Sequence, residues 1–119
     1  PQDQRYSRAV EFSVDEDAMT VTQEWDYGGL GEEFFYSSYI SDADWLPVTG
    51  NVLVTDGGRR DDENGMAAEF DSGGRPWAQI FEVTRTEPAE KVFHIVLQDE
   101  APAGYQVYRA QRLPSLYPE

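Results

Sequence analysis

The chain contains no cysteine and only one histidine, His94. Without cysteine there is no disulfide, no zinc–thiolate site and no thiol nucleophile. One histidine cannot serve as both the nucleophile and the general acid of a group-transfer reaction. The residues present also offer no serine–histidine–aspartate, metal-binding or phosphate-loop motif. The sequence therefore predicts no catalytic residue, no metal and no cofactor within these 119 residues.

Basic residues are scarce as well, with nine lysines and arginines against 23 acidic residues and a net charge of −14. Nucleic acids and anionic membranes repel such a polyanion, so neither is expected as a partner. No apolar run approaches the ~20 residues that a membrane-spanning helix needs. The acidic composition indicates a need for solubility, or a salty or extracytoplasmic setting.

Strand-like alternation is abundant, whereas helix patterns are nearly absent. In "RAVEFSVD" apolar residues alternate with polar ones, which is typical of a strand with one buried face. "NVLVT" is almost wholly apolar, as expected of a strand covered on both faces. Residues 47–51 predict a turn in which Gly50 supplies a positive φ. Residues 1–119 are therefore expected to be a single all-β unit.

Two predicted hairpins repeat the same plan. Phe12-Ser13-Val14 corresponds to Phe81-Glu82-Val83, and Val21 corresponds to Val92. The acidic, glycine-rich residues 56–74 between the hairpins predict a surface insertion. Without that insertion the spacing approaches the ~40–50 residues of a β-propeller blade.

The predicted architecture is thus an antiparallel four-stranded blade plus a half blade of a β-propeller. Residues 1–29 are the outer hairpin of one blade, residues 41–100 are a complete blade, and residues 105–118 are a closing strand. Propellers close by pairing strands from distant parts of the chain. The alternative is a self-contained β-sandwich of seven strands.

The first residues, "PQDQRYSRAVEF", have no initiator methionine and no apolar signal-peptide core. They are typical of a cut end, so we expect a mature piece of a longer protein whose signal peptide is not in this chain. The closing strand is then expected to pair with a strand upstream of Pro1 or with another chain.

Four segments carry a family resemblance. "YSRAVEFSVDEDAMTVTQEWDYG" resembles the late segment of the bacterial arylsulfotransferases, the arylsulfate sulfotransferase family. "SDADWLPVTGNVLVTDGG", "AQIFEVTRT" and "YRAQRLPSLYP" continue the similarity in the same order. The resemblance covers most of Tyr6–Pro118 and is weakest near Arg59–Ser72.

The resemblance implies a six-bladed propeller that works as a dimer in the periplasm or outside the cell. It also implies transfer of a sulfuryl group from a phenolic sulfate donor to a phenol acceptor, through a transiently sulfated histidine and without the nucleotide donor PAPS. In the family that histidine lies upstream of the "YSRAVE" segment. The chain is therefore expected to be the C-terminal part of such an enzyme and to be inactive alone. His94, in an outer strand, is expected to be structural.

The innermost strand of the blade is expected to start near "FYSSYISDAD". The residues placed best to face a central site are Tyr36, Ser37, Ser38, Ser41 and Asp42. Tyrosines offer an aromatic wall for a phenol, and hydroxyl groups offer hydrogen-bond partners. The guanidinium of Arg8 offers a planar fork for sulfate oxygens. The plainer alternative is that these tyrosines and serines pack on the blade and that Arg8 pairs with a carboxylate.

Arg109 and Arg112 are expected to neutralise acidic neighbours and to fix the closing strand from its two faces. The acidic run "DDENG" lacks the ligand spacing of a calcium-binding loop, so calcium is not expected. Trp25, Trp45 and Trp77 occur once per hairpin and are expected in the core or in the packing between blades.

Two functions of other classes stay open. One is a non-catalytic extracytoplasmic binding or assembly module. Its open strand edges would pair with the rest of a propeller or with another copy of the chain, as in a homodimer. The other is a carbohydrate-binding sandwich with exposed tryptophans. Channel histidines upstream in the gene would favour the enzyme, and a start codon and signal sequence just before Pro1 would favour the module.

Overall fold

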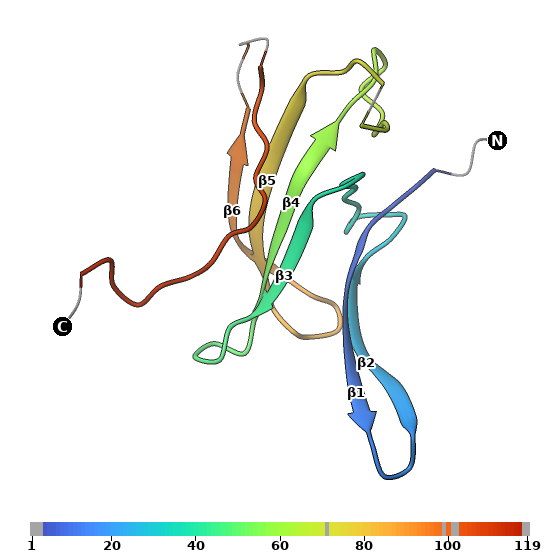
Figure 1. The fold of residues 1–119 in the computed structure, drawn as a ribbon, viewed down its shortest axis with the longest axis vertical. Coiled ribbons are helices and arrows are strands. Elements are labelled where there is room, and N and C mark those ends of the chain that lie inside the picture. Colours follow the sequence, from blue (N-terminus) through green and yellow to red (C-terminus); the bar gives the residue numbers. More distant parts are fainter. Residues whose placement is uncertain (1–3, 71, 99, 101–102, 118–119) are drawn as a thin grey trace.

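The computed structural model describes residues 4–70, 72–98, 100 and 103–117, and in these residues every regular element is a β-strand. Strands β1 (Arg8–Asp15) and β2 (Thr20–Gly28) form an antiparallel hairpin. Four further strands form an antiparallel sheet in the order β3-β4-β5-β6 (Figure 1): β3 (Ser41–Trp45), β4 (Val52–Arg60), β5 (Pro76–Val83) and β6 (Lys91–Leu97). The predicted all-β class is confirmed. The described part of the chain has no helix long and apolar enough to cross a membrane.

The four-stranded sheet is compatible with one propeller blade and the hairpin with half of a neighbouring blade. Its strands are joined in sequence order, with a short turn between β3 and β4. In that turn the amide of Leu46 donates to the carbonyl of Asn51 over 2.8 Å. Gly50 has φ of 76°, which confirms the predicted positive φ at this glycine.

The core lies between the hairpin and one face of the sheet. It consists of buried side chains from both, namely Ala9, Trp25, Tyr27, Phe35, Val52, Val54, Phe81 and Val83. Phe81, only 1% exposed, is at its centre. Its ring centroid lies 5.6 Å from those of Tyr27 in β2 and Phe35 in the β2–β3 connection. This aromatic cluster holds the hairpin and the connection against the sheet.

Strand β4 corrects the predicted boundary of the acidic insertion. Residues 56–60 were expected in a surface insertion, yet they continue β4, and Asp56 is fully buried. A bulge at the two glycines shifts the register between Asp56 and Arg59. Gly57 is required for close approach, because a Cβ there would lie 1.7 Å from the carbonyl oxygen of Val107. The glycine pair is therefore a contact point within a strand, and not the start of a loop.

The C-terminal segment corrects a second prediction. Residues 105–117 were expected to lie in a closing strand, but in the structure they are not a strand and cross the face of the sheet (Figure 1). The amide of Val107 donates to the carbonyl of Gly57 over 3.0 Å, and that of Ala110 donates to Thr55 Oγ1 over 3.1 Å. A segment that lies on the face of a sheet cannot form the regular backbone hydrogen bonds that join the edges of two neighbouring strands. Residue 118 of the predicted strand lies outside the described residues.

Two arginines fasten this segment to the sheet. Arg109 Nε lies 3.0 Å from Asp42 Oδ2, and its Nη2 lies 3.2 Å from Asp44 Oδ1, both on β3. Arg112 pairs with the buried Glu82 of β5, whose pKa this arginine lowers. The prediction that both arginines neutralise acidic neighbours is confirmed, although the element that they fix is not a strand.

The three tryptophans differ in environment. Trp25 is buried in the core, as predicted. Trp77 is half-buried, and its indole nitrogen donates to Asp61 Oδ2 over 2.7 Å. Trp45 is exposed, so it is not a core residue of the described chain, and packing between blades stays a prediction for it. It is the last residue of β3, at the edge of the sheet, where the described residues provide no covering layer.

Candidate functional site

One end of the sheet gathers three segments that are distant in sequence. They are residues 4–7 before β1, the β2–β3 connection and the β4–β5 connection. The amide of Ser7 donates to the carbonyl of Phe35 over 2.9 Å, and the amide of Gly57 donates to that of Ile40 over 3.1 Å. The first hydrogen bond ties the β2–β3 connection to residues 4–7, and the second ties it to strand β4. We call this part of the molecule the loop end.

The loop end contains a cavity of about 920 Å³. Its lining combines charged, amide and apolar side chains, including Arg5, Tyr36, Asp62, Asn64, Met66 and Glu69. The cavity is open to solvent on one side, and its polar groups come from all three segments. Such a mixture suits a small ligand that has one polar group on an apolar body.

A tyrosine, a carboxylate and an arginine meet in this cavity. The hydroxyl of Tyr36 donates to Glu69 Oε1 over 2.8 Å, and Arg5 forms an ion pair with the same oxygen. Burial, followed by the hydrogen bond to Glu69, raises the pKa of Tyr36. The phenol group of Tyr36 therefore stays protonated at neutral pH and is a hydrogen-bond donor, not a base.

The six predicted site residues do not form one site. Tyr36 lines the loop-end cavity, whereas Ser41 and Asp42 border a separate notch of about 260 Å³ together with Tyr108 and Arg109. The two remaining serines line neither cavity. The hydroxyl of Ser37 donates to the carbonyl of Ile40 and accepts from the amide of Gly58, while Ser38 Oγ is buried without a hydrogen-bond partner in the described chain.

Arg8, the sixth predicted residue, lies away from the cavity lining. Its Nη1 is 3.0 Å from Asp26 Oδ2 across the hairpin, and both side chains are partly exposed. This is the salt bridge that was considered as the plainer alternative for Arg8.

Sequence patterns missed the other polar residues of the cavity. Arg5 precedes the first strand, and Asp62, Asn64 and Glu69 lie in the segment expected to be a solvated insertion. Arg5 and Glu69 are 64 positions apart, so no local spacing links them. Only the fold brings them together, because the segment before β1 and the β4–β5 connection reach the same end of the sheet.

His94 lies elsewhere, on the outer strand β6. Its Nε2 is 2.8 Å from Gln79 Oε1, and Gln79 Nε2 donates to Asp56 Oδ2 over 2.8 Å. Because the glutamine amide nitrogen is directed to the carboxylate, its oxygen accepts and His94 Nε2 carries the proton. Burial and then the nearby Lys91 lower the pKa of His94. This histidine is held by structural hydrogen bonds and is absent from the lining of the loop-end cavity.

Comparison with protein families gives a match over nearly the whole chain. The family described as arylsulfotransferase (ASST) matches residues 1–109. The chain belongs to the arylsulfotransferase family. Comparison with the curated proteins and with the solved structures gave no match. The match supports the resemblance found in the sequence, and it includes all three segments of the arylsulfotransferase loop end.

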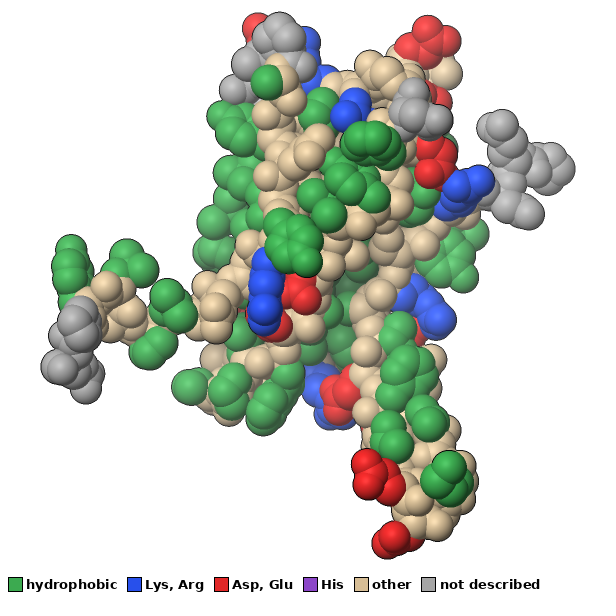
Figure 2. Space-filling view, in the orientation of Figure 1, with side chains coloured by type: hydrophobic (Ala, Val, Ile, Leu, Met, Phe, Trp, Pro, Cys, Tyr) green, Lys and Arg blue, Asp and Glu red, His purple; other side chains and the backbone are tan. Residues whose placement is uncertain are grey.

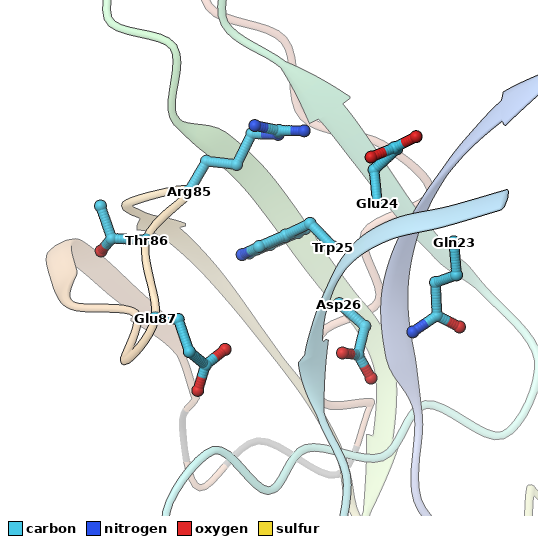
Figure 3. A pocket seen from close by; sticks show the side chains of 7 residues that line it. All are labelled: Gln23, Glu24, Trp25, Asp26, Arg85, Thr86 and Glu87. Carbon is cyan, nitrogen blue, oxygen red and sulfur yellow. The ribbon is translucent and has the colours of Figure 1, made fainter.

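A further cavity of this arylsulfotransferase chain, of about 390 Å³, lies between β2 and the β5–β6 turn (Figure 3). Trp25 extends from β2 toward Thr86 in the turn. At its border Arg85 forms a two-point ion pair with Glu11, with Nη2 2.7 Å from Oε1. Arg85 is thereby neutralised, so this cavity has no free cation to hold a sulfate. Among the described residues there is no group of histidine, cysteine, aspartate or glutamate suited to a metal ion.

The buried Asp56 leads to a prediction about pH. Burial raises its pKa, and Gln79 and Arg59 only partly oppose that effect. When folding raises the pKa of a carboxyl, the contribution of that carboxyl to stability is largest at low pH. The contribution falls as the pH rises from the pKa of the unfolded state through the pKa of the folded state. Asp56→Asn removes the charge and keeps the shape. We expect the variant to be more stable than the parent protein at pH 8, with the difference vanishing near pH 4.

Urea denaturation of both proteins across this range measures the difference. Glu11 and Glu82 have lowered pKa values, so their protonation in acid destabilises both proteins equally. This contribution cancels when the free energy of unfolding of the parent protein is subtracted from that of the variant. A variant that is less stable than the parent at pH 8 would show that Arg59 and Gln79 outweigh the burial of the Asp56 charge.

Proposed function

We propose that this chain is the C-terminal part of an arylsulfotransferase propeller that moves a sulfuryl group from an aryl sulfate to a phenol. The family match over residues 1–109 carries the proposal. In the proposed reaction an aryl O–S bond of the donor breaks as a histidine N–S bond forms, which releases the donor phenol. The histidine N–S bond then breaks as the acceptor oxygen takes the sulfuryl group, and the acceptor's proton passes to solvent, which balances the proton taken up by the released donor phenolate.

The reacting histidine is proposed to lie outside these residues, upstream of the hairpin. His94 is a poor candidate for this role, because its ring packs edge-on against Phe81 and it is absent from the lining of the loop-end cavity. The contribution of this chain is then to complete the ring and to shape its loop end. We place the protein in the periplasm or outside the cell, a prediction with which the acidic composition agrees.

Within this function, we assign the phenol acceptor to the loop-end cavity. The charges of Asp62 and Glu69 exceed that of Arg5, so the lining favours a neutral phenol over an anionic aryl sulfate. Because the Tyr36 hydroxyl gives its proton to Glu69, its oxygen is the acceptor that it offers to the proton of a phenol hydroxyl. The apolar body of a phenol would lie against Met66 and the two neighbouring alanines.

The test is a transfer assay with the natural gene product that carries these residues, a chromogenic aryl sulfate and a phenol. For Tyr36→Phe we expect the acceptor KM to rise by up to about tenfold, the size of one lost hydrogen bond, with the donor KM unchanged. Tyr117→Phe, at an exposed position of the C-terminal segment, is the matched control and should change neither constant.

The outcomes separate the alternatives. Transfer with an unchanged acceptor KM in Tyr36→Phe would remove the acceptor from this cavity but keep the reaction. Absence of any transfer would overturn the enzyme proposal and leave the non-catalytic binding or assembly module.

A further inference from the structure

The β4–β5 connection contains a tight turn within the acidic run "DDENG". The amide of Asp62 donates to the carbonyl of Met66 over 2.8 Å, and the amide of Gly65 donates to the carbonyl of Asp62 over 3.0 Å. Asp62 Oδ1 accepts from the amides of Asn64 and Met66. Gly65 has φ of 74°, the left-handed conformation that closes such a turn. The run therefore forms a defined turn, although it lacks the spacing of a calcium-binding loop.

The bond between Asn64 and Gly65 lies at the surface. Residues 62–65 are exposed, and a Cβ built on Gly65 would meet no atom within 4 Å. The side-chain amide of Asn64 has no hydrogen-bond partner among the described residues. Figure 2 shows acidic side chains at the end of the molecule where the β4–β5 connection lies in Figure 1. Water can therefore reach both residues, and the hydrogen bonds of the turn are what restrains them.

An asparagine that precedes a glycine can lose its side-chain amide without an enzyme. The backbone nitrogen of the glycine attacks Cγ of the asparagine, and the absence of a Cβ on glycine leaves that approach unhindered. The attack needs backbone freedom at the two residues. A turn held by a few exposed hydrogen bonds gains this freedom by local opening. The Asn64–Gly65 bond combines the reactive sequence with such a turn.

We propose that Asn64 is a site of spontaneous deamidation that adds a carboxylate to the loop-end cavity. The nitrogen of Gly65 forms a bond to Cγ of Asn64, while the bond from Cγ to the side-chain nitrogen breaks. That nitrogen leaves as ammonia, which takes the proton of the Gly65 amide. Water then opens the cyclic imide at either of its carbonyl carbons. One opening yields aspartate, and the other yields isoaspartate, in which the backbone runs through the side chain.

The product changes the charge of the cavity. Asn64 lines the cavity together with Asp62, Glu69 and Arg5, so its conversion adds a second uncompensated negative charge. An anionic ligand is then repelled more strongly, whereas a neutral ligand is little affected. Isoaspartate also lengthens the backbone of the turn and disturbs the hydrogen bonds around Asp62. The consequence for acceptor binding rests on the proposed function, but the deamidation itself does not.

Two other bonds of the chain provide internal references. Asn51 is the other asparagine, and its side-chain nitrogen donates to Glu82 Oε1 over 2.7 Å. A branched residue follows it, which hinders the attack. The Asp56–Gly57 bond could form the same imide with loss of water, but it lies within strand β4 and Asp56 is fully buried. Neither bond is expected to react in the folded protein.

Peptide mapping by mass spectrometry tests the modification directly. The gene product with its natural ends is incubated at pH 8, because the reaction needs a deprotonated amide nitrogen and becomes faster as the pH rises. We expect the mass change from amide to acid at Asn64, with aspartate and isoaspartate as separable products. In the same sample Asn51 should keep its amide, and Asp56 should remain ordinary aspartate.

Two variants test the role of the turn, with circular dichroism to confirm folding. Asn64→Gln keeps a side-chain amide but would have to close a larger and less favourable ring, so it should stay unmodified. Asp62→Ala removes the oxygen that holds two amides of the turn, so Asn64 should react several-fold faster.

Transfer assays on the incubated proteins test the effect on the cavity. With a phenol that is ionised at the assay pH, the acceptor KM should rise by up to about fivefold, the effect of one unit charge about 4 Å away in water. A neutral phenol should show little change, and incubated Asn64→Gln should show neither effect. Unchanged KM values with Asn64 converted would remove the acceptor from this cavity, while the deamidation would stand.

An intact amide at Asn64 after incubation of the parent protein would overturn the proposal. Equal loss at Asn51 would also overturn it, because the reaction would then be unselective. An unchanged rate in Asp62→Ala would contradict the argument that opening of this turn controls the reaction.

Discussion

Phe81→Ala is expected to destabilise the protein by about 3–5 kcal/mol, the usual cost of removing a fully buried phenylalanine. The ring contacts Tyr27 of the hairpin, Phe35 of the β2–β3 connection and His94 of β6. Its loss leaves a cavity where three parts of the fold meet. Because small domains have only about 5–15 kcal/mol of stability, this variant should lose a large share of it.

Urea denaturation followed by tryptophan fluorescence measures the change, since Trp25 belongs to the same core. The matched control is Phe12→Ala on β1, where the phenylalanine is 56% exposed, and there we expect less than about 1 kcal/mol. Equal effects of the two substitutions would show that the hairpin does not pack on the sheet through Phe81.

Gly57→Ala is expected to release the C-terminal segment from the sheet. The added Cβ would lie 1.7 Å from the carbonyl oxygen of Val107, a distance that no side-chain rotation can relieve. Overpacking of this kind costs about 1–3 kcal/mol. The ion pairs of Arg109 with β3 are partly exposed and therefore weak, so we expect the segment to leave the sheet around residues 107–109, while Arg112 can keep its pair with the buried Glu82.

Limited trypsin digestion measures how readily the C-terminal segment leaves the sheet, because trypsin cleaves after Arg109 and Arg112. We expect much faster cleavage after Arg109 in the variant than in the parent protein. Ala43→Val, at an exposed position on β3, adds methyl groups without a clash and should change neither stability nor cleavage. Unchanged cleavage in Gly57→Ala would mean that the segment does not cross the sheet at this glycine.

The strands were predictable because burial of one or both faces leaves a regular pattern in the sequence. The apolar residues 52–54 of β4 are buried, as their continuous run predicts. The alternation in β1 predicted a strand, but the expected buried face was wrong there, because Phe12 and Val14 are exposed. The bulge at Gly57 was not predictable, because a glycine pair after an apolar strand is equally typical of a loop. Its function depends on Val107, fifty positions later in the chain, and local patterns contain no information about that contact.

The C-terminal segment shows a related limit. "GYQVYRAQRL" has the composition of a strand, but composition does not say whether a segment joins an edge or lies on a face. Within the described residues it lies on a face, where Gly57 leaves room for its backbone.

The candidate site was predictable only in part. Tyr36 was predicted as a site residue because it lies just before the strand expected to be innermost, and in the structure it lines the loop-end cavity. Arg5 and Glu69 were not, since each lies in a polar segment without periodicity and they meet only in the folded chain. Ser37 was expected to meet substrate, but its hydroxyl is occupied by backbone groups of Ile40 and Gly58.

The most direct test of the proposed function is to locate the covalent intermediate. The natural gene product is incubated with an aryl sulfate in the absence of acceptor, digested, and mapped by mass spectrometry. The account predicts a sulfuryl group on a histidine outside residues 1–119, lost when a phenol is added, and none on His94. A sulfuryl group on His94, or its absence from every histidine, would contradict the account.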